Sequence, residues 1–167
     1  AADLGDIVYT TTTTGSVILT GTSTATGDDV QVTSVGSING AGLVTASTVN
    51  LNAATGIGNT AALELAAITI TADNSTSGII DINNALGTAV TVTTLTTAGG
   101  GNIVFDNAGA GGVSFGTVGT SDDGTGVEGE NDITLRSDGG PLTITTSVTA
   151  ADLGDIVYTT TTTGSVI

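Results

Sequence analysis

The sequence predicts an all-β fold, a parallel β-solenoid with about six coils in each 149 residues. Three observations support this fold. Thr, Gly and β-branched residues are abundant, and these residue types favour pleated strands and tight turns over helices. A short motif of alternating apolar residues returns along the chain at intervals of about 20 to 30 residues. Finally, the chain ends with the same eighteen residues with which it begins, at an offset of 149.

The composition defines what the interior can be made of. The 167-residue chain has two Tyr, two Phe and no Trp, Met or Cys, so Val, Ile, Leu and Ala must build the core. Only 10% of the residues are charged and the mean hydropathy is +0.38, which argues against disorder. No apolar run reaches eighteen residues, so we expect no transmembrane segment.

The charge balance excludes one class of partner. Sixteen acidic residues against the single base Arg136 give a formal net charge of -15. A surface this acidic repels phosphate groups, so nucleic acid is not an expected partner. Divalent cations, which neutralise carboxylates, are the partners that the charge favours.

The recurring motif marks one strand of each expected coil. It consists of an apolar residue, any residue and a second apolar residue, usually after Asp, Asn or Gly. Its occurrences are DIVY at 6–9, DVQV at 29–32, TVNL at 48–51, IIDI at 79–82, NIVF at 102–105, DITL at 132–135 and DIVY at 155–158. The spacing between occurrences is uneven, and the last occurrence lies one full period after the first.

A second alternating stretch follows each motif and predicts the next strand of the same coil. These stretches are SVILT at 16–20, GLVTA at 42–46, ALELAAITIT at 62–71, AVTVTTLTT at 89–97, GVSFG at 112–116 and PLTITTSVT at 141–149. Two or three short strands in every turn of about 20 to 30 residues are typical of a parallel β-solenoid.

Period-2 alternation predicts which residues face the core. One inward ladder is expected to contain Ile7, Val30, Val49, Ile80, Ile103 and Ile133. A second is expected to contain Tyr9, Val32, Leu51, Ile82, Phe105 and Leu135. The residues between them, expected to point outward, are Val8, Gln31, Asn50, Asp81, Val104 and Thr134. Because most of these outward residues are polar, a one-residue slip would bury them, and the register is well specified.

Short polar residues precede several of these strands. They are Asp6, Asp29, Asn102, Asp132 and Asp155. A side chain of this kind can accept hydrogen bonds from nearby backbone N–H groups, so we expect a structural role at the start of each strand. A β-sandwich of the immunoglobulin kind stays open as an alternative fold, although its strands do not recur as one motif.

The eighteen-residue identity predicts the domain organisation. Residues 1–149 are interpreted as one complete tandem repeat, and residues 150–167 as the start of the next identical repeat. We therefore expect the chain to belong to a longer tandem array.

Three stretches carry a resemblance to a known family. They are GLVTASTVNLNAATGIG at 42–58, LTTAGGGNIVFDNAGAGGVSFG at 95–116 and ENDITLRSDGGPLTITTSV at 130–148. These resemble the repeats of filamentous-haemagglutinin-like exoproteins and related giant β-strand-repeat surface proteins of Gram-negative bacteria. The resemblance implies a right-handed parallel β-helix, secretion to the cell surface, and service as a stalk or adhesive filament, with no active-site residues to carry over.

The residues needed for most catalysis are missing. Without His, Cys or Lys, the chain cannot form a Ser–His–Asp triad or a Cys/His zinc site, and we expect no enzymatic activity. A glycosidase dyad at Asp28–Asp29 or Asp122–Asp123 is an alternative, but adjacent acids more often form a solvated turn. Thr-rich solenoid faces can bind ice, but unequal coil lengths are expected to break such a row.

The densest acidic stretch is SDDGTGVEGEND at 121–132. It places five carboxylates in a Gly-rich loop: Asp122, Asp123, Glu128, Glu130 and Asp132. Carboxylate oxygens are Ca²⁺ ligands, so the loop is a candidate calcium site, with a plain solvated loop as the alternative. Asn74-Ser75-Thr76 matches the N-glycosylation sequon, which makes glycans a further candidate partner.

Repetition, charge and the lack of catalytic residues together favour a structural function. We expect a repeat of an extracellular bacterial filament or surface fibre, which supplies length, stiffness and an acidic surface and stacks on copies of itself along the fibre axis. The alternative is a stalk or binding segment of a giant adhesin involved in surface attachment or biofilm.

Overall fold

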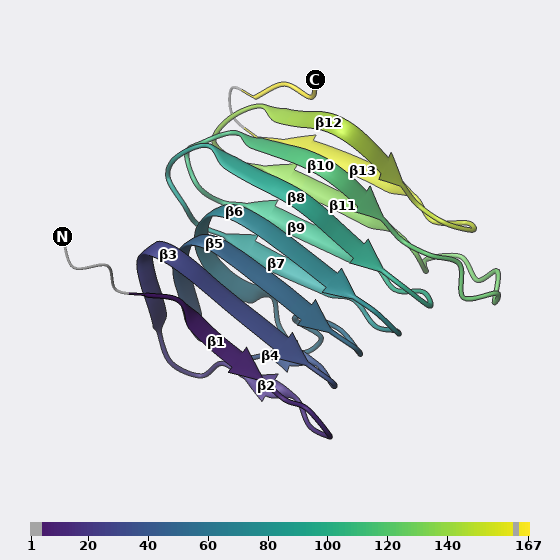
Figure 1. The fold of residues 1–167 in the computed structure, drawn as a ribbon. Coiled ribbons are helices and arrows are strands. Elements are labelled where there is room, and N and C mark those ends of the chain that lie inside the picture. Colours follow the sequence, from purple (N-terminus) through teal and green to yellow (C-terminus); the bar gives the residue numbers. More distant parts are fainter. Residues whose placement is uncertain (1–4, 162–163) are drawn as a thin grey trace.

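The chain forms a stack of parallel β-coils in a computed structural model that describes residues 5–161 and 164–167. The strands in this part of the chain are β1 (Ile7–Thr10), β2 (Val17–Ile18), β3 (Ser23–Ser34), β4 (Ile38–Asn39), β5 (Leu43–Ala53), β6 (Leu63–Asn74), β7 (Ile80–Asn84), β8 (Val90–Thr97), β9 (Ile103–Asn107), β10 (Val113–Gly119), β11 (Ile133–Ser137), β12 (Leu142–Thr149) and β13 (Ile156–Thr160). Every strand pairing among them is parallel, and none of the described residues is helical (Figure 1). The predicted β-solenoid is therefore confirmed, and the antiparallel sandwich is excluded.

Two walls enclose the core. Wall 1 consists of β1, the second halves of β3, β5 and β6, and then β8, β10 and β12. Wall 2 consists of β2, β4, the first halves of β3, β5 and β6, and then β7, β9, β11 and β13. The sheet forks at β6, because its first half pairs with β7 and its second half with β8.

The position of the turns changes along the stack. In the early coils, the long strands β3, β5 and β6 run from wall 2 into wall 1 without a break in the strand. In the later coils, wall 2 is a single five-residue strand, and a turn separates it from wall 1 at 85–89, 108–112 and 138–141. Coils of different length therefore share the same walls, since the extra residues lie in the turns.

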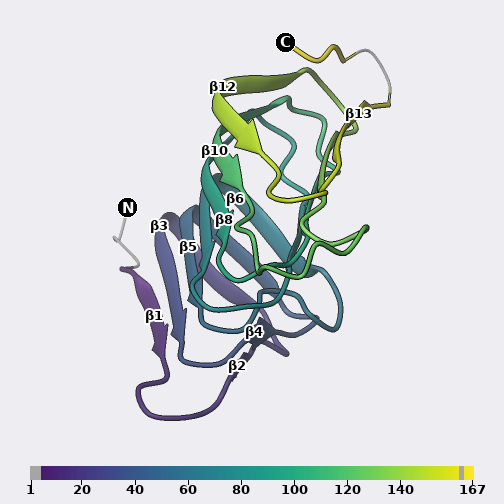
Figure 2. The ribbon, with the colours of Figure 1, turned by 90° about the vertical axis from the view of Figure 1, so that its right-hand side faces the viewer.

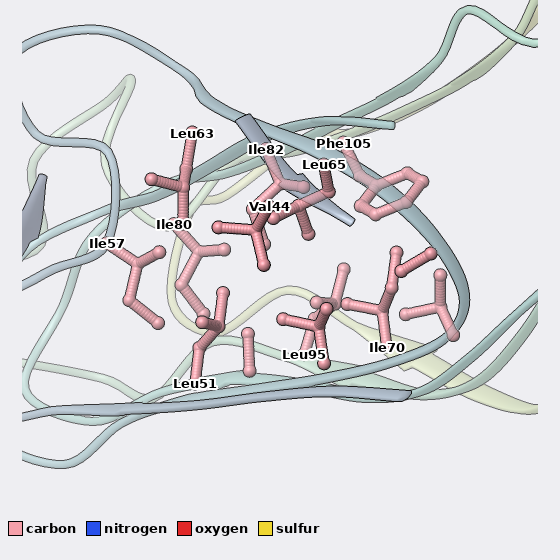
Figure 3. Close-up of a cluster of buried hydrophobic side chains, with 14 of the residues drawn as sticks. Val44, Leu51, Ile57, Leu63, Leu65, Ile70, Ile80, Ile82, Leu95 and Phe105 are labelled. Atoms are coloured by element: carbon pink, nitrogen blue, oxygen red, sulfur yellow. The ribbon is translucent and has the colours of Figure 1, made fainter. Parts of the chain in front are cut away.

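Each wall contributes an apolar column to the core. The wall 1 column contains Ile7, Val30, Val49, Ile70, Val92, Phe115 and Ile144. The wall 2 column contains Val17, Ile38, Ile57, Ile80, Ile103, Ile133 and Ile156. Figure 3 shows side chains of the two walls meeting in the interior, with Ile70 and Leu95 facing Leu65 and Phe105. Phe105 and Phe115 meet edge to face across the core, with ring centroids 5.4 Å apart.

Each of the two inward ladders predicted from the sequence is correct for the residues that lie in one wall. Each is wrong where it continues from wall 1 into wall 2. Val49 pairs with Ile70, whereas Ile80 belongs to the opposite wall, so the expected first ladder joins two different columns. The second ladder breaks at the same place, between Leu51 and Ile82. The cause is the stretch at 62–71, which forms one long strand that supplies both walls. The residues expected to point outward are confirmed, since none of them is buried.

The structure gives the predicted coil count of about six more finely. Six pairing steps lead from Ile7 up wall 1 to Ile144. Ile156, the repeat of Ile7, lies half a coil further on, in wall 2. The 149-residue period therefore spans six and a half coils, and the two copies of the same segment occupy opposite walls.

Candidate functional site

Buried and half-buried polar side chains close the turns at both edges of the solenoid. At the edge where wall 1 ends, Asn74 donates from Nδ2 to the carbonyls of Ser77 and Gly78, at 2.6 and 2.7 Å. The same kind of bond, to a carbonyl three or four residues later, is made by Thr11, Ser34 and Thr97 at this edge and by Asn107 and Thr160 at the other. A polar residue followed four positions later by Gly is the sequence signal for most of these turns, and sequence reasoning missed it.

Asn84 and Asn107 form the most buried part of this system. Both are fully buried and stack in register at the end of wall 2. Asn84 accepts from the Ala67 N–H at 2.9 Å through Oδ1, and its Nδ2 donates to Asn107 Oδ1 at 3.4 Å. Asn107 in turn donates to the Gly111 carbonyl at 2.8 Å. These residues satisfy backbone groups that the turn would otherwise bury without partners.

The predicted glycan site lies inside this system. Asn74 is fully buried, its Oδ1 accepts from the Gly56 N–H at 2.8 Å, and its Nδ2 donates to two carbonyls. N-glycosylation would require this same nitrogen at the surface. The folded chain therefore argues against a glycan at Asn74, and the sequon match is explained by the structural use of Asn at this turn.

The acidic loop projects from the edge of the stack, visible in green on the right of Figure 1. Asp122 accepts from the Gly124 N–H at 2.6 Å, and Asp123 accepts from the backbone and the hydroxyl of Thr125, at 3.0 and 2.8 Å. The bonds from Thr125 hold the pKa of the Asp123 carboxyl below its usual value. Glu130 accepts from the same Thr125 hydroxyl at 2.7 Å, so the Asp123 and Glu130 side chains lie close together.

Among the described residues, no hydrogen bond joins the other candidate calcium ligands to this pair. Glu128 is exposed, and Asp132 lies just before β11, where its backbone N–H donates to Asn102 Oδ1 at 3.0 Å. Within residues 5–161 and 164–167, no three acidic side chains come together in the way that a metal ion needs. Calcium binding by the loop stays a prediction, which isothermal titration at millimolar Ca²⁺ would check.

The polar residues at strand starts form two columns rather than one. In wall 1, Asp6 accepts from the Asp29 N–H at 3.2 Å. In wall 2, Asn102 accepts from Asp132, and Asp132 accepts from the Asp155 N–H at 2.8 Å. The expected structural role is confirmed for Asp6, Asn102 and Asp132, with the difference that these side chains accept from the next coil instead of their own turn.

Further carboxylates lie on or beside the walls. Burial raises the pKa of Asp81, and the nearby Glu64 charge adds to the effect. Burial also raises the pKa of Asp106, against the opposing effect of Arg136, whose nitrogen lies 3.4 Å away. Arg136 makes its shorter ion pair with Asp138, at 2.7 Å. These charged groups are spread along the walls.

Wall 1 also carries a row of hydroxyl side chains in register. The row contains Thr48, Thr69, Thr91, Ser114 and Thr143. Unequal coil lengths were expected to break such a row, but they do not, because the extra residues lie in the turns.

The first and last described coils lie at opposite ends of the stack (Figure 2). At one end, a hollow of about 250 Å³ is lined by the first coil, including Tyr9, Val17 and Leu19. At the other end, the last coil leaves apolar side chains exposed: Leu153, Ile156, Val157, Tyr158, Val166 and Ile167. Among the described pairings, β1 pairs with β3 alone and β13 with β11 alone.

Searches of protein-family models, curated proteins and solved structures found no match to this chain. The likeness to filamentous-haemagglutinin-like proteins therefore remains an expectation from the sequence. Among the described residues, no helix has the length and apolarity to cross a membrane.

Proposed function

We propose that this chain is a structural repeat of an extracellular filament or surface fibre. The observation that carries the proposal is the continuous stack of coils, whose core columns run from one end to the other. Backbone hydrogen bonds between coils run along the axis of such a stack, so a pull along the axis is shared by several parallel bonds in each coil. Length then increases in proportion to the number of copies.

The acidic surface fits this function. Within residues 1–149, fourteen of the sixteen acids and Arg136 give a net charge of -13. At about 4.8 Å for each coil, six and a half coils have a height of about 31 Å. The charge is therefore about one for every 2.4 Å of axis, which keeps neighbouring rods apart and soluble unless cations gather between them.

Chains that contain one, two or four copies of the 149-residue unit test the proposal by small-angle X-ray scattering. We expect the maximum dimension to grow by about 31 Å with each copy while the cross-section stays constant. A matched series with Ile80→Asp and Ile103→Asp in every copy charges the core and should lose this linear growth. Compact particles whose cross-section grows with copy number would refute the rod.

The stalk of a giant adhesin is the alternative function. In an adhesin, the same rod would serve as a spacer. The scattering series therefore tests the rod shape that both functions require and does not separate them. Binding of fluorescent single-copy protein to bacterial cells or to glass separates them. Saturable binding would favour an attachment segment, whereas its absence would favour the purely structural function.

A further inference from the structure

We propose that the outward face of wall 1 is an ice-binding surface, whose ligand is crystalline water. The centre of this surface is the hydroxyl row of wall 1, which consists of Thr48, Thr69, Thr91, Ser114 and Thr143. The inference goes beyond the proposed fibre function and does not depend on it, because it needs only the folded coils.

The hydroxyl row is regular in space although its members are unevenly spaced in the chain. More residues separate Ser114 from Thr143 than separate Thr48 from Thr69. All five members nevertheless pair in register across the neighbouring strands β5, β6, β8, β10 and β12 (Figure 1). Paired strands lie about 4.8 Å apart, so the row repeats at this interval along the axis. A crystal of water also repeats its oxygen atoms at fixed intervals, and only a regular array of side chains can match such a lattice.

The hydroxyls of this row are available to water. Among residues 5–161 and 164–167, no hydrogen bond joins any of the five to another side chain or to the backbone. Other hydroxyls on the same face are bonded within the protein, since Thr71 and Thr93 bond to each other at 3.2 Å and Thr145 donates to the Phe115 carbonyl at 2.8 Å. Each hydroxyl of the row is therefore free to donate one hydrogen bond and to accept others from water.

The hydroxyl row is also rigid. The residues that follow its first four members, Val49, Ile70, Val92 and Phe115, are fully buried in the core. A β-branched Thr is stiff about χ1, so the hydroxyl and the methyl group keep their positions on the sheet. Groups that are already fixed lose little conformational entropy when they meet a crystal.

The outward face of wall 1 is nearly uncharged, although the chain has a net charge of -15. From β5 to β12, Asp73 is the one acidic residue among the described outward positions of this wall, and it accepts from the Thr96 hydroxyl. The strands of wall 2, by contrast, carry charged side chains at outward positions: Glu64, Asp81, Asp106 and Arg136. A charged group must give up its hydration shell to fit a crystal of water, and this is costly. The separation of charge therefore leaves wall 1 as the face suited to ice.

The same face lacks the groups that most protein partners need. Between β5 and β12, no aromatic or basic side chain occupies a described outward position of wall 1. Aromatic residues and Arg supply most of the binding energy at protein interfaces. A face made of Thr, Ser and Asn therefore favours a ligand that is itself an array of hydroxyl groups.

The test freezes a dilute solution of the full chain slowly and measures the fraction of the protein that enters the ice. Growing ice excludes ordinary solutes, so we expect the chain to be enriched in the ice relative to serum albumin. The wall 1 variant, Thr69→Lys with Thr91→Lys, places strongly hydrated ammonium groups in the row and should be excluded. The wall 2 variant, Thr45→Lys with Thr134→Lys, makes the same change in charge on the other wall and should enter the ice as the unchanged chain does.

Ser114 allows a test in the opposite direction. It is the one member of the row without a methyl group, and water beside a methyl group is restricted in its orientation. Ser114→Thr should therefore increase the fraction of protein in the ice. Circular dichroism checks that every variant is folded, and Thr91→Tyr, which adds bulk without charge in a residue that favours strands, must lower the fraction if the Lys variant unfolds.

Three outcomes would overturn the proposal. The first is exclusion of the unchanged chain from ice to the same extent as albumin, and the second is equal entry of the wall 1 and wall 2 variants. The third is retention of the chain on cellulose, lost in the wall 1 variant, without any enrichment in ice, which would assign the face to a neutral polysaccharide. The tandem scattering series is independent of all three, so the failure of this inference and the failure of the fibre function can be told apart.

Discussion

At the scale of the residue, inward polar side chains at the turns decide where each coil bends. The apolar columns are built from interchangeable Val, Ile and Leu, and such residues define a core without defining where it ends. Asn74, Asn84 and Asn107 are fully buried and bond to backbone groups of the turns. Each of these Asn side chains therefore fits only the turn whose backbone groups it bonds, and in this way the repetitive chain specifies which residues form each turn.

Asn84→Ala should lower the free energy of unfolding by about 2 kcal/mol, because it leaves the Ala67 N–H buried without a partner. Its neighbour offers a matched control. Asn83 points outward and donates to Glu64 at 2.9 Å, so Asn83→Ala should cost less than about 0.5 kcal/mol. Urea denaturation of both variants measures the difference, and equal losses would contradict the role given to Asn84.

The stability of the folded chain should increase as the pH falls from 7 towards 4. The pKa values of Asp81 and Asp106 are raised above 3.8 in the folded state, by burial first in both cases. A carboxyl group with a raised pKa stabilises the fold at low pH, and this contribution is lost as the pH rises through the folded-state value. The melting temperature against pH checks this, and Asp81→Asn should flatten the curve more than Asp122→Asn, which removes the same charge from the exposed loop.

At the scale of the element, strands tolerate little change and turns tolerate a great deal. The chain is longer between Ile103 and Ile133 than between Ile80 and Ile103, yet all three side chains share one column. The extra residues lie in the acidic loop. Coil length is therefore a property of the turns, and the walls are the constant part of each coil.

Deletion of residues 122–128 should leave the fold intact and change the free energy of unfolding by no more than about 1 kcal/mol, since closing a shorter surface loop costs little entropy. It would leave Thr120 six positions before the start of β11, as Thr97 is before the start of β9. Thermal unfolding measures the effect. Deletion of an equally long piece of β8, 91–97, is the control and should abolish cooperative unfolding.

The strands and their outward residues could be predicted from the sequence, because period-2 alternation depends only on neighbours in the chain. The assignment to walls could not. Val49 is followed by apolar residues at the correct spacing in both walls, and nothing local distinguishes Ile70 from Ile80 as its partner. The turn residues were missed for a different reason: buried Asn and Thr look like solvated loop residues until their carbonyl partners are known.

At the scale of the whole molecule, charge and stacking act in opposite directions. Backbone pairing between coils holds the stack together along its axis, whereas the net charge of -15 repels neighbouring rods. Attraction along the axis and repulsion between the sides therefore act in different directions. This combination favours growth along the axis over lateral aggregation.

Millimolar Mg²⁺ or Ca²⁺ should increase the light scattering of the protein, because divalent ions neutralise the carboxylates that keep rods apart. NaCl at the same ionic strength is the control and should have a smaller effect, since it only screens the repulsion. Equal scattering with both salts would show that screening alone accounts for the response. No change with divalent ions would contradict lateral association through cations.

The half coil left over in each repeat has a geometric consequence. In an array that continued this pattern, every copy would be turned by half a revolution relative to the one before it, which is the operation of a twofold screw axis. Odd and even copies would then present opposite flanks, and the surface would repeat only after two periods of 149 residues. The acidic loops of successive copies would project alternately to the two sides of the rod. A rod made from one repeated sequence would therefore carry two rows of acidic loops on opposite sides, with each row offset from the other by one repeat.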